Sequence, residues 1–124
     1  MNPAEAVLHF KKVAPYKVGY DKRKEAMTEL VERLALYYGI PAKVFFHCPE
    51  IHDSCSSYAS LYLDGRKEIH MVGKLSIITL LHEFAHLLGA NEDEARAYSI
   101  SLFKRCYPRA FGKLKQDGVC WKEA

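Results

Sequence analysis

The run KLSIITLLHEFAHLL at residues 74–88 constrains the fold most, because it is apolar nearly all round a helical wheel. A helix of this kind is buried on every side, and we expect it at the centre of the structure. Beyond Lys74 at its start, three ionisable residues nonetheless lie within it, namely His82, Glu83 and His86. Burying such groups without partners is costly. The run therefore predicts a central helix that carries a functional site.

The chain has 124 residues, of which 49% are hydrophobic and 27% are charged. This composition predicts one domain, residues 1–124, with a core that needs no disulfides. The balance of 18 Lys and Arg against 15 Asp and Glu leaves a net charge of +3, too small by itself to indicate nucleic acid. We find no signal-peptide pattern and no apolar stretch long enough for a membrane, and expect a soluble cytoplasmic protein.

Apolar residues recur at helical spacing ahead of a Gly-x-Pro stop: Met27, Leu30, Val31, Leu34 and Tyr38. Asp21 can cap the start of this helix, and Gly39 and Pro41 can end it. Residues 22–38 are therefore predicted to form an amphipathic N-terminal helix.

Three segments are rich in β-branched and aromatic residues, at 43–47, 57–63 and 67–72. Asp64 and Gly65 are suited to a tight turn between the last two. We expect a small antiparallel sheet of about three strands.

Another helix is predicted after the central one, from Glu92 to about Arg105, with a break at Gly89 and with Asn91 as its cap. Residues 107–124 form a basic, less periodic C-terminal tail. The fold class is therefore α+β, with the order N-terminal helix, small sheet, buried central helix and the helix that begins at Glu92.

The two histidines of the central run, His82 and His86, are four residues apart and share one face of a helix. Imidazole nitrogens suit Zn²⁺, and a catalytic zinc takes three protein ligands and one water. Glu83 is offset by about 100° around the wheel, so it can flank the ion and take a proton from the zinc-bound water. The alternative is a pair of core histidines with hydrogen-bond partners. Three ionisable groups at these offsets favour the zinc site.

The acidic residues 92–94 follow the central helix and can supply the third ligand. We assign Glu92 to zinc. Glu94 lies three residues after Asn91, which fits the reciprocal partner in a capping box. Glu94 stays open as the alternative ligand, and the acidic cluster could also be an ordinary negative first turn.

His82, Glu83 and His86 resemble the HExxH signature of the zincin metallopeptidases. In gluzincins a glutamate on a following helix is the third ligand, often preceded by asparagine, as Glu92 is here by Asn91. The resemblance implies peptide hydrolysis, with Glu83 activating the water.

Related families such as the ImmA/IrrE-like peptidases place the ligand glutamate three residues before an alanine, as Glu92 stands to Ala95. They often continue with Asp or Asn, where this chain has Arg96. The stretch also resembles the metzincin pattern through Gly89, but no methionine follows Met71 to form a Met-turn.

The order of elements across residues 22–106 is similar to that of the minigluzincins. This resemblance implies that the strand at 67–72 is an edge strand that binds an extended peptide. It also implies a terminal segment that can block the cleft, so the tail with Cys120 and Trp121 could cover the zinc and keep the enzyme latent. Candidates for stabilising the oxyanion are Tyr98, Tyr107 and His70.

The cysteines and the histidines near them allow two further predictions. The segment 47–55 holds His47, Cys48, His52 and Cys55, which could bind a second metal but match no standard spacing. Cys106 and Cys120 are expected to be free in a reducing compartment.

Basic residues gather near the C-terminus, at Lys104, Arg105, Arg109, Lys113 and Lys115. We expect a solvated surface there rather than nucleic-acid binding. The competing function is nevertheless a non-catalytic, zinc-stabilised module that binds protein or nucleic acid. The primary expectation is a peptidase with a peptide or protein substrate and no membrane partner.

Overall fold

The computed structural model describes the backbone of residues 1–15, 17–47, 57–117 and 120–123, and side chains within these ranges up to residue 113. The helices are α1 (Pro3–Val13), α2 (Tyr20–Tyr38), α3 (Ile77–Leu87), α4 (Glu92–Cys106) and α5 (Pro108–Phe111). The strands are β1 (Lys43–Phe46), β2 (Tyr58–Leu61), β3 (Lys67–Met71), β4 (Leu114–Asp117) and β5 (Cys120–Glu123). The predicted α+β class is confirmed. In the described residues, no helix is long and apolar enough to cross a bilayer.

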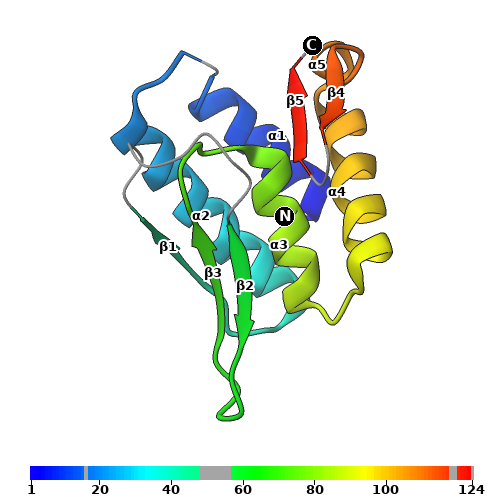
Figure 1. The fold of residues 1–124 in the computed structure, drawn as a ribbon. Helices are drawn as coiled ribbons and strands as arrows, with labels where there is room; N and C mark the ends of the chain where they lie inside the picture. Colours follow the sequence, from blue (N-terminus) through cyan, green and yellow to red (C-terminus); the bar gives the residue numbers. More distant parts are fainter. Residues whose placement is uncertain (16, 48–56, 118–119, 124) are drawn as a thin grey trace.

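The three-stranded sheet has the order β1-β3-β2 and is mixed (Figure 1). β2 and β3 form the predicted antiparallel hairpin, whereas β1 runs parallel to β3. The prediction of an antiparallel sheet is therefore wrong for the β1–β3 pair. The turn at Asp64 and Gly65 sets the direction of β2 against β3. No comparable local signal sets the direction in which β1 joins the far side of β3.

β3 is the central strand, so the prediction that it is the edge strand is also wrong. Its side chains alternate: Ile69 and Met71 are fully buried, and His70 lies on the opposite face. A strand that supplies core residues in the middle of a sheet has both backbone edges occupied. The edge next to the central helix belongs to β2 instead.

Helices α2 and α3 cover one face of the sheet (Figure 1). α3 is the central helix that the sequence predicts. Its buried residues lie on several sides of the helix: Ile77, Ile78, Leu80, Leu81, Phe84, Ala85 and Leu87. Lys67 of β3 donates from Nζ to the carbonyl oxygen of Leu87 at 2.9 Å. This bond ties the central strand to the end of the central helix.

α1 is not among the predicted elements, although its start carries a clear signal. Asn2 accepts from the Glu5 backbone N–H at 2.8 Å, and the Glu5 side chain accepts from the Asn2 N–H at 3.1 Å. This is a capping box followed by a proline at the first helical turn. Val7 and Phe10 then bury the inner face of α1 against α2 and α4.

α2 matches the predicted N-terminal helix, with a small difference at its start. Gly19 is the N-cap, and Asp21 lies inside the first turn and makes no cap bond. The helix ends as predicted at Gly39, which takes a positive φ of 69°. An L-residue with a side chain rarely adopts this conformation, so glycine suits the stop.

The C-terminal segment is more regular than the predicted tail. α5 follows α4, and β4 and β5 pair antiparallel with Asp117 opposite Cys120. β5 lies against α3. The side chains of Cys120 and Trp121 lie outside the described residues, so the covering of the cleft by this segment stays a prediction.

Candidate metal centre

His82 and His86 project from one face of α3, as their spacing predicts. Their ring centroids are 5.0 Å apart and the ring planes are inclined by 75°. The side chains are only 16% and 23% exposed. The remaining faces of α3 are buried in the core, so the backbone that positions these imidazoles is held on several sides.

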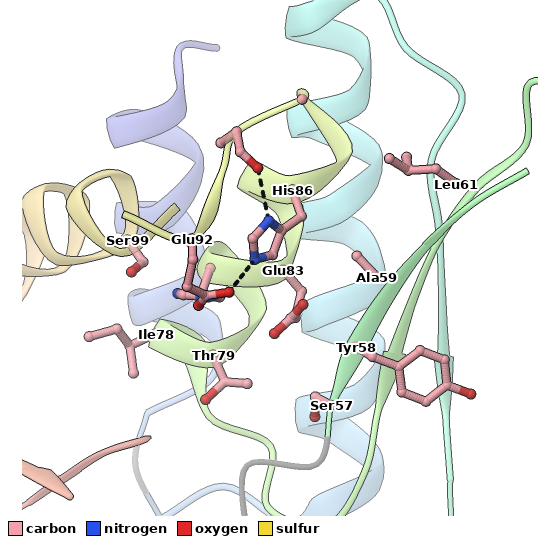
Figure 2. Close-up of a pocket in the computed structure, with 13 residues that line it drawn as sticks. Ser57, Tyr58, Ala59, Leu61, Ile78, Thr79, Glu83, His86, Glu92 and Ser99 are labelled. Atoms are coloured by element: carbon pink, nitrogen blue, oxygen red, sulfur yellow. Dashed lines mark hydrogen bonds and ion pairs between the residues drawn. The ribbon is translucent and has the colours of Figure 1, made fainter. Parts of the chain in front are cut away.

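Glu92, the first residue of α4, meets both histidines. Its Oε1 lies 2.6 Å from Nε2 of His82. Its Oε2 lies 3.3 Å from Nε2 of His86, a contact that Figure 2 marks with a dashed line. Within the described residues, these three side chains form the one group of His, Cys, Asp and Glu whose ligand atoms all lie within 4.8 Å of one another. The structure thus brings together the three residues predicted as metal ligands.

The loop between α3 and α4 aims Glu92 back at α3. Gly89 takes a positive φ of 92°, which reverses the chain. Asn91 then accepts from the Glu94 N–H at 2.8 Å, while Glu94 accepts from the Asn91 N–H at 2.9 Å. The predicted capping box is confirmed. With its side chain engaged at the cap, Glu94 does not belong to the cluster with the histidines.

The orientation of His86 is fixed by a backbone carbonyl. Its Nδ1 lies 3.0 Å from the oxygen of Ala90, and a carbonyl oxygen only accepts, so Nδ1 carries the proton (Figure 2). The lone pair is therefore on Nε2, which faces Glu92. This arrangement is typical of a histidine that binds a metal.

His82 is held in its neutral form mainly by burial, which lowers its pKa below the ordinary value. Glu92 opposes this shift, and the charges of His86 and Arg96 add to it. A neutral imidazole is the form that binds a metal. Arg96 also bonds Asp93 at 3.5 Å. Arg96 places a cation near His82.

Glu83 lies one residue from the first histidine and points into the space between α3 and β2 (Figure 2). Burial raises the pKa of its carboxyl to about 7. A cation at the His82–His86–Glu92 cluster would favour the carboxylate form. Glu83 therefore lies where its carboxyl group can exchange a proton with a group bound in the cleft.

A cleft of about 560 Å³ contains this group. Its lining comprises Ser57, Tyr58, Ala59, Leu61, Ile78, Thr79, His82, Glu83, His86, Gly89, Ala90, Glu92 and Ser99. Successive residues of β2 contribute, including Tyr58 from one face of the sheet and Ala59 from the other. The cleft therefore meets β2 at its edge rather than at one face.

The edge of β2 that faces away from β3 carries backbone groups with no partner strand among the described residues. The backbone N–H of Tyr62 donates to the Arg66 carbonyl oxygen at 3.0 Å. Ser60 and Tyr58 lie two and four residues before Tyr62, so their backbone groups also point toward β3. In an antiparallel pair, alternate residues bond to the partner strand. The N–H and C=O of Ala59 and Leu61 therefore point away from β3, toward the free edge.

The three candidates for stabilising an oxyanion do not line the cleft. Tyr98 bonds Tyr38 through the two hydroxyls at 3.0 Å. Tyr107 stacks on Phe103, with ring centroids 4.8 Å apart. His70 lies on the outer face of the sheet. Among the described residues, the cleft offers no tyrosine hydroxyl from these positions.

The cysteine predictions are tested only in part. Cys106 is buried and free, as predicted. Cys48, His52 and Cys55 lie outside the described residues, as does the side chain of Cys120. The proposed metal cluster at 47–55 thus stays a prediction, except for the placement of His47.

No protein-family model, curated protein or solved structure matches the chain. The assignment of the site therefore depends on its geometry and on the residues themselves. The role of β2 as a wall of the cleft was not predicted, because strand order depends on long-range pairing. The role of Ala90 was also missed, because a carbonyl acceptor has no side-chain signal.

The chemistry of the cluster fits a metal ion. Its donors are two imidazole nitrogens and one carboxylate, a ligand set that suits zinc. A carboxylate oxygen cannot donate, so each close contact between Glu92 and an imidazole needs a proton or a cation. Burial disfavours the imidazolium at His82. A divalent cation satisfies all three groups together.

Proposed function

We propose that the protein is a zinc-dependent peptidase. The observation that carries this proposal is the shared cleft: Glu83 and the cluster of His82, His86 and Glu92 line it together with the free edge of β2. A metal cluster, a proton-accepting carboxylate and a strand edge are the three parts that metal-assisted peptide hydrolysis needs.

His82, His86 and Glu92 would hold the zinc ion. When bound, zinc supplies Lewis acidity toward a carbonyl oxygen and lowers the pKa of water to roughly 7. Glu92 is 56% exposed at its side chain, which leaves the cluster accessible from the cleft. This accessibility distinguishes the cluster from a closed structural site with four protein ligands.

Glu83 would act as the general base and then as the general acid. Its carboxylate takes a proton from the attacking water and delivers a proton to the leaving amine. The raised pKa, about 7, makes the Glu83 carboxylate a stronger base toward water than an ordinary glutamate. Glu83 is not one of the three clustered ligands, so its role separates from metal binding.

The substrate would be an extended peptide or protein segment that pairs with β2. The outward N–H and C=O groups of Ala59 and Leu61 are free to accept such a strand. A peptide in this position runs along the cleft past Glu83. Strand pairing reads the backbone, so it suits substrates of varied sequence.

The test is Glu83→Gln, compared with wild type on casein and on a fluorogenic peptide library. We expect loss of hydrolysis by at least about 100-fold, the usual scale of general acid–base catalysis. Zinc content should stay equal to that of wild type, because Glu83 is not a ligand. Asp93→Asn is the matched control, because Asp93 is exposed, pairs only with Arg96 among the described contacts, and loses the same charge.

Retained hydrolysis in Glu83→Gln would refute the mechanism. Zinc binding by a wild-type protein that cleaves neither substrate would instead favour the non-catalytic binding module. Salt-dependent binding of DNA that is unaffected by Glu83→Gln would support that alternative directly.

A further inference from the structure

The outer face of the sheet, opposite α2 and α3, carries a second pair of histidines. Nε2 of His47, which follows β1, lies 3.0 Å from Nδ1 of His70 on β3. The parallel register places Phe45 opposite His70, so His47 two residues later shares the same face. The two imidazoles are thus brought together by the pairing of β1 with β3.

A carboxylate fixes which nitrogen of His70 carries the proton. Oε1 of Glu68 lies 3.2 Å from Nε2 of His70, and both side chains are only 13% exposed. A carboxylate attracts the N–H, so His70 holds its proton on Nε2 and its lone pair on Nδ1. That lone pair faces His47. Metal-binding histidines are commonly oriented by a carboxylate in this way.

Two aromatic rings hold the plane of His70. The ring of Tyr58 from β2 lies 4.6 Å from it at 12°, and the ring of Phe45 from β1 lies 5.3 Å from it at 16°. These contacts come from the strands on either side of β3. The orientation of Nδ1 is therefore set by packing as well as by hydrogen bonding.

We propose that His47 and His70 form a second metal site, which binds a borderline divalent transition metal such as Ni²⁺, Cu²⁺ or Zn²⁺. Imidazole is a preferred ligand of these ions. His47 Nε2 and His70 Nδ1 supply two ligands, and water completes the coordination. The ion would join β1 to β3, the pair of strands that no short turn connects. This site is separate from the cleft and does not depend on the proposed peptidase activity.

The present contact between the two histidines is a hydrogen bond. The ring centroids are 5.2 Å apart and the rings are inclined by 25°, so the two nitrogens meet nearly head on. His70 Nδ1 accepts, and His47 Nε2 donates. His47 is exposed, so exchange with solvent can move its proton from Nε2 to Nδ1, which frees the Nε2 lone pair for an ion that takes the place of the hydrogen bond. His70 need not move.

The test is a titration of the metal-free full chain with Ni²⁺, followed by equilibrium dialysis and thermal unfolding. Wild type should bind two equivalents, one in the cleft and one at His47 and His70. His47→Ala and His70→Ala should each lose one equivalent and the rise in Tm that it produces. The double variant His82→Ala/His86→Ala should keep the outer equivalent.

Three further variants make the test specific. Glu68→Ala should weaken the second equivalent by about tenfold, the scale expected when the carboxylate that orients a ligand is removed. His9→Ala is the matched control, because His9 also lies beside a carboxylate, Glu29 at 3.4 Å, but is paired with no second histidine among the described residues. Cys48→Ser/Cys55→Ser should retain the outer equivalent, since the proposed site uses no thiol.

A single equivalent in wild type that the double variant His82→Ala/His86→Ala loses would overturn the proposal. So would a second equivalent that survives His47→Ala or that disappears in Cys48→Ser/Cys55→Ser, because the ligands would then lie elsewhere.

Discussion

His86 donates from Nδ1 to the carbonyl oxygen of Ala90 at 3.0 Å, and this bond joins a metal-ligand candidate on α3 to the loop that leads into α4. The same loop delivers Glu92. One short segment thus orients the second histidine and positions the carboxylate that faces it. The geometry of the cluster therefore depends on the backbone of residues 88–91 as much as on the side chains.

Gly89→Val is predicted to disturb both functions of this loop. Gly89 has a φ of 92°, a conformation that costs a β-branched residue about 1–3 kcal/mol. Relief of this strain would shift the Ala90 carbonyl and weaken zinc binding. Gly112→Ala is the control, because Gly112 has ordinary helical geometry and space for a methyl group. Chemical denaturation and zinc competition measure the two effects. Equal stability and zinc affinity in Gly89→Val and wild type would contradict the prediction.

Glu92→Ala and Glu94→Ala are predicted to have opposite phenotypes. Glu92→Ala should lose most of the zinc bound in the cleft, because one of three clustered ligands disappears. Glu94→Ala should keep its zinc but lose about 0.5–2 kcal/mol of stability with the capping box. Chelation of wild-type zinc should lower Tm, since bound metal stabilises the folded state. Metal analysis and thermal unfolding distinguish these outcomes. Zinc retained by Glu92→Ala and lost by Glu94→Ala would reverse the assignment.

Arg96→Gln is predicted to raise zinc affinity. The guanidinium lies close enough to His82 to contribute to the lowering of its pKa, and the same charge repels a divalent cation. Removing it should improve affinity by about threefold at low ionic strength, with a smaller gain in salt. Arg105→Gln, near the other end of α4, is the charge-matched control and should leave affinity unchanged. Competition with a chromogenic chelator gives the measurement, and a decrease in affinity for Arg96→Gln would contradict the electrostatic argument.

Local signals in the sequence predicted most helices and all three strands of the main sheet. The spacing of His82 and His86 fixes their common face, and the Asn91–Glu94 box fixes the start of α4. These features depend on residues a few positions apart. The chain encodes them in its helical periodicity and in capping side chains, which can be read directly.

Long-range pairing could not be predicted in the same way. The parallel join of β1 to β3 makes β3 central and leaves β2 at the edge of the cleft. The strand at 67–72 has the composition expected of either an edge or a central strand, so composition cannot decide. The meeting of His47 with His70 also depends on this pairing. Such contacts form only when the whole core packs, and Ile69 and Met71 of β3 are fully buried in that core.

The edge position of β2 leads to a prediction about substrate binding. Ala59→Pro removes an N–H that points away from β3, so the sheet keeps its own hydrogen bonds and an edge strand tolerates the proline. If an extended peptide pairs with β2, one hydrogen bond to the substrate is lost, worth about 1 kcal/mol. KM should then rise about fivefold, with kcat nearly unchanged because Glu83 is untouched. Ala59→Ser keeps the N–H at similar size and should behave as wild type. Thermal unfolding of both variants verifies folding, and an unchanged KM in a folded Ala59→Pro variant would show that the peptide does not pair at this position.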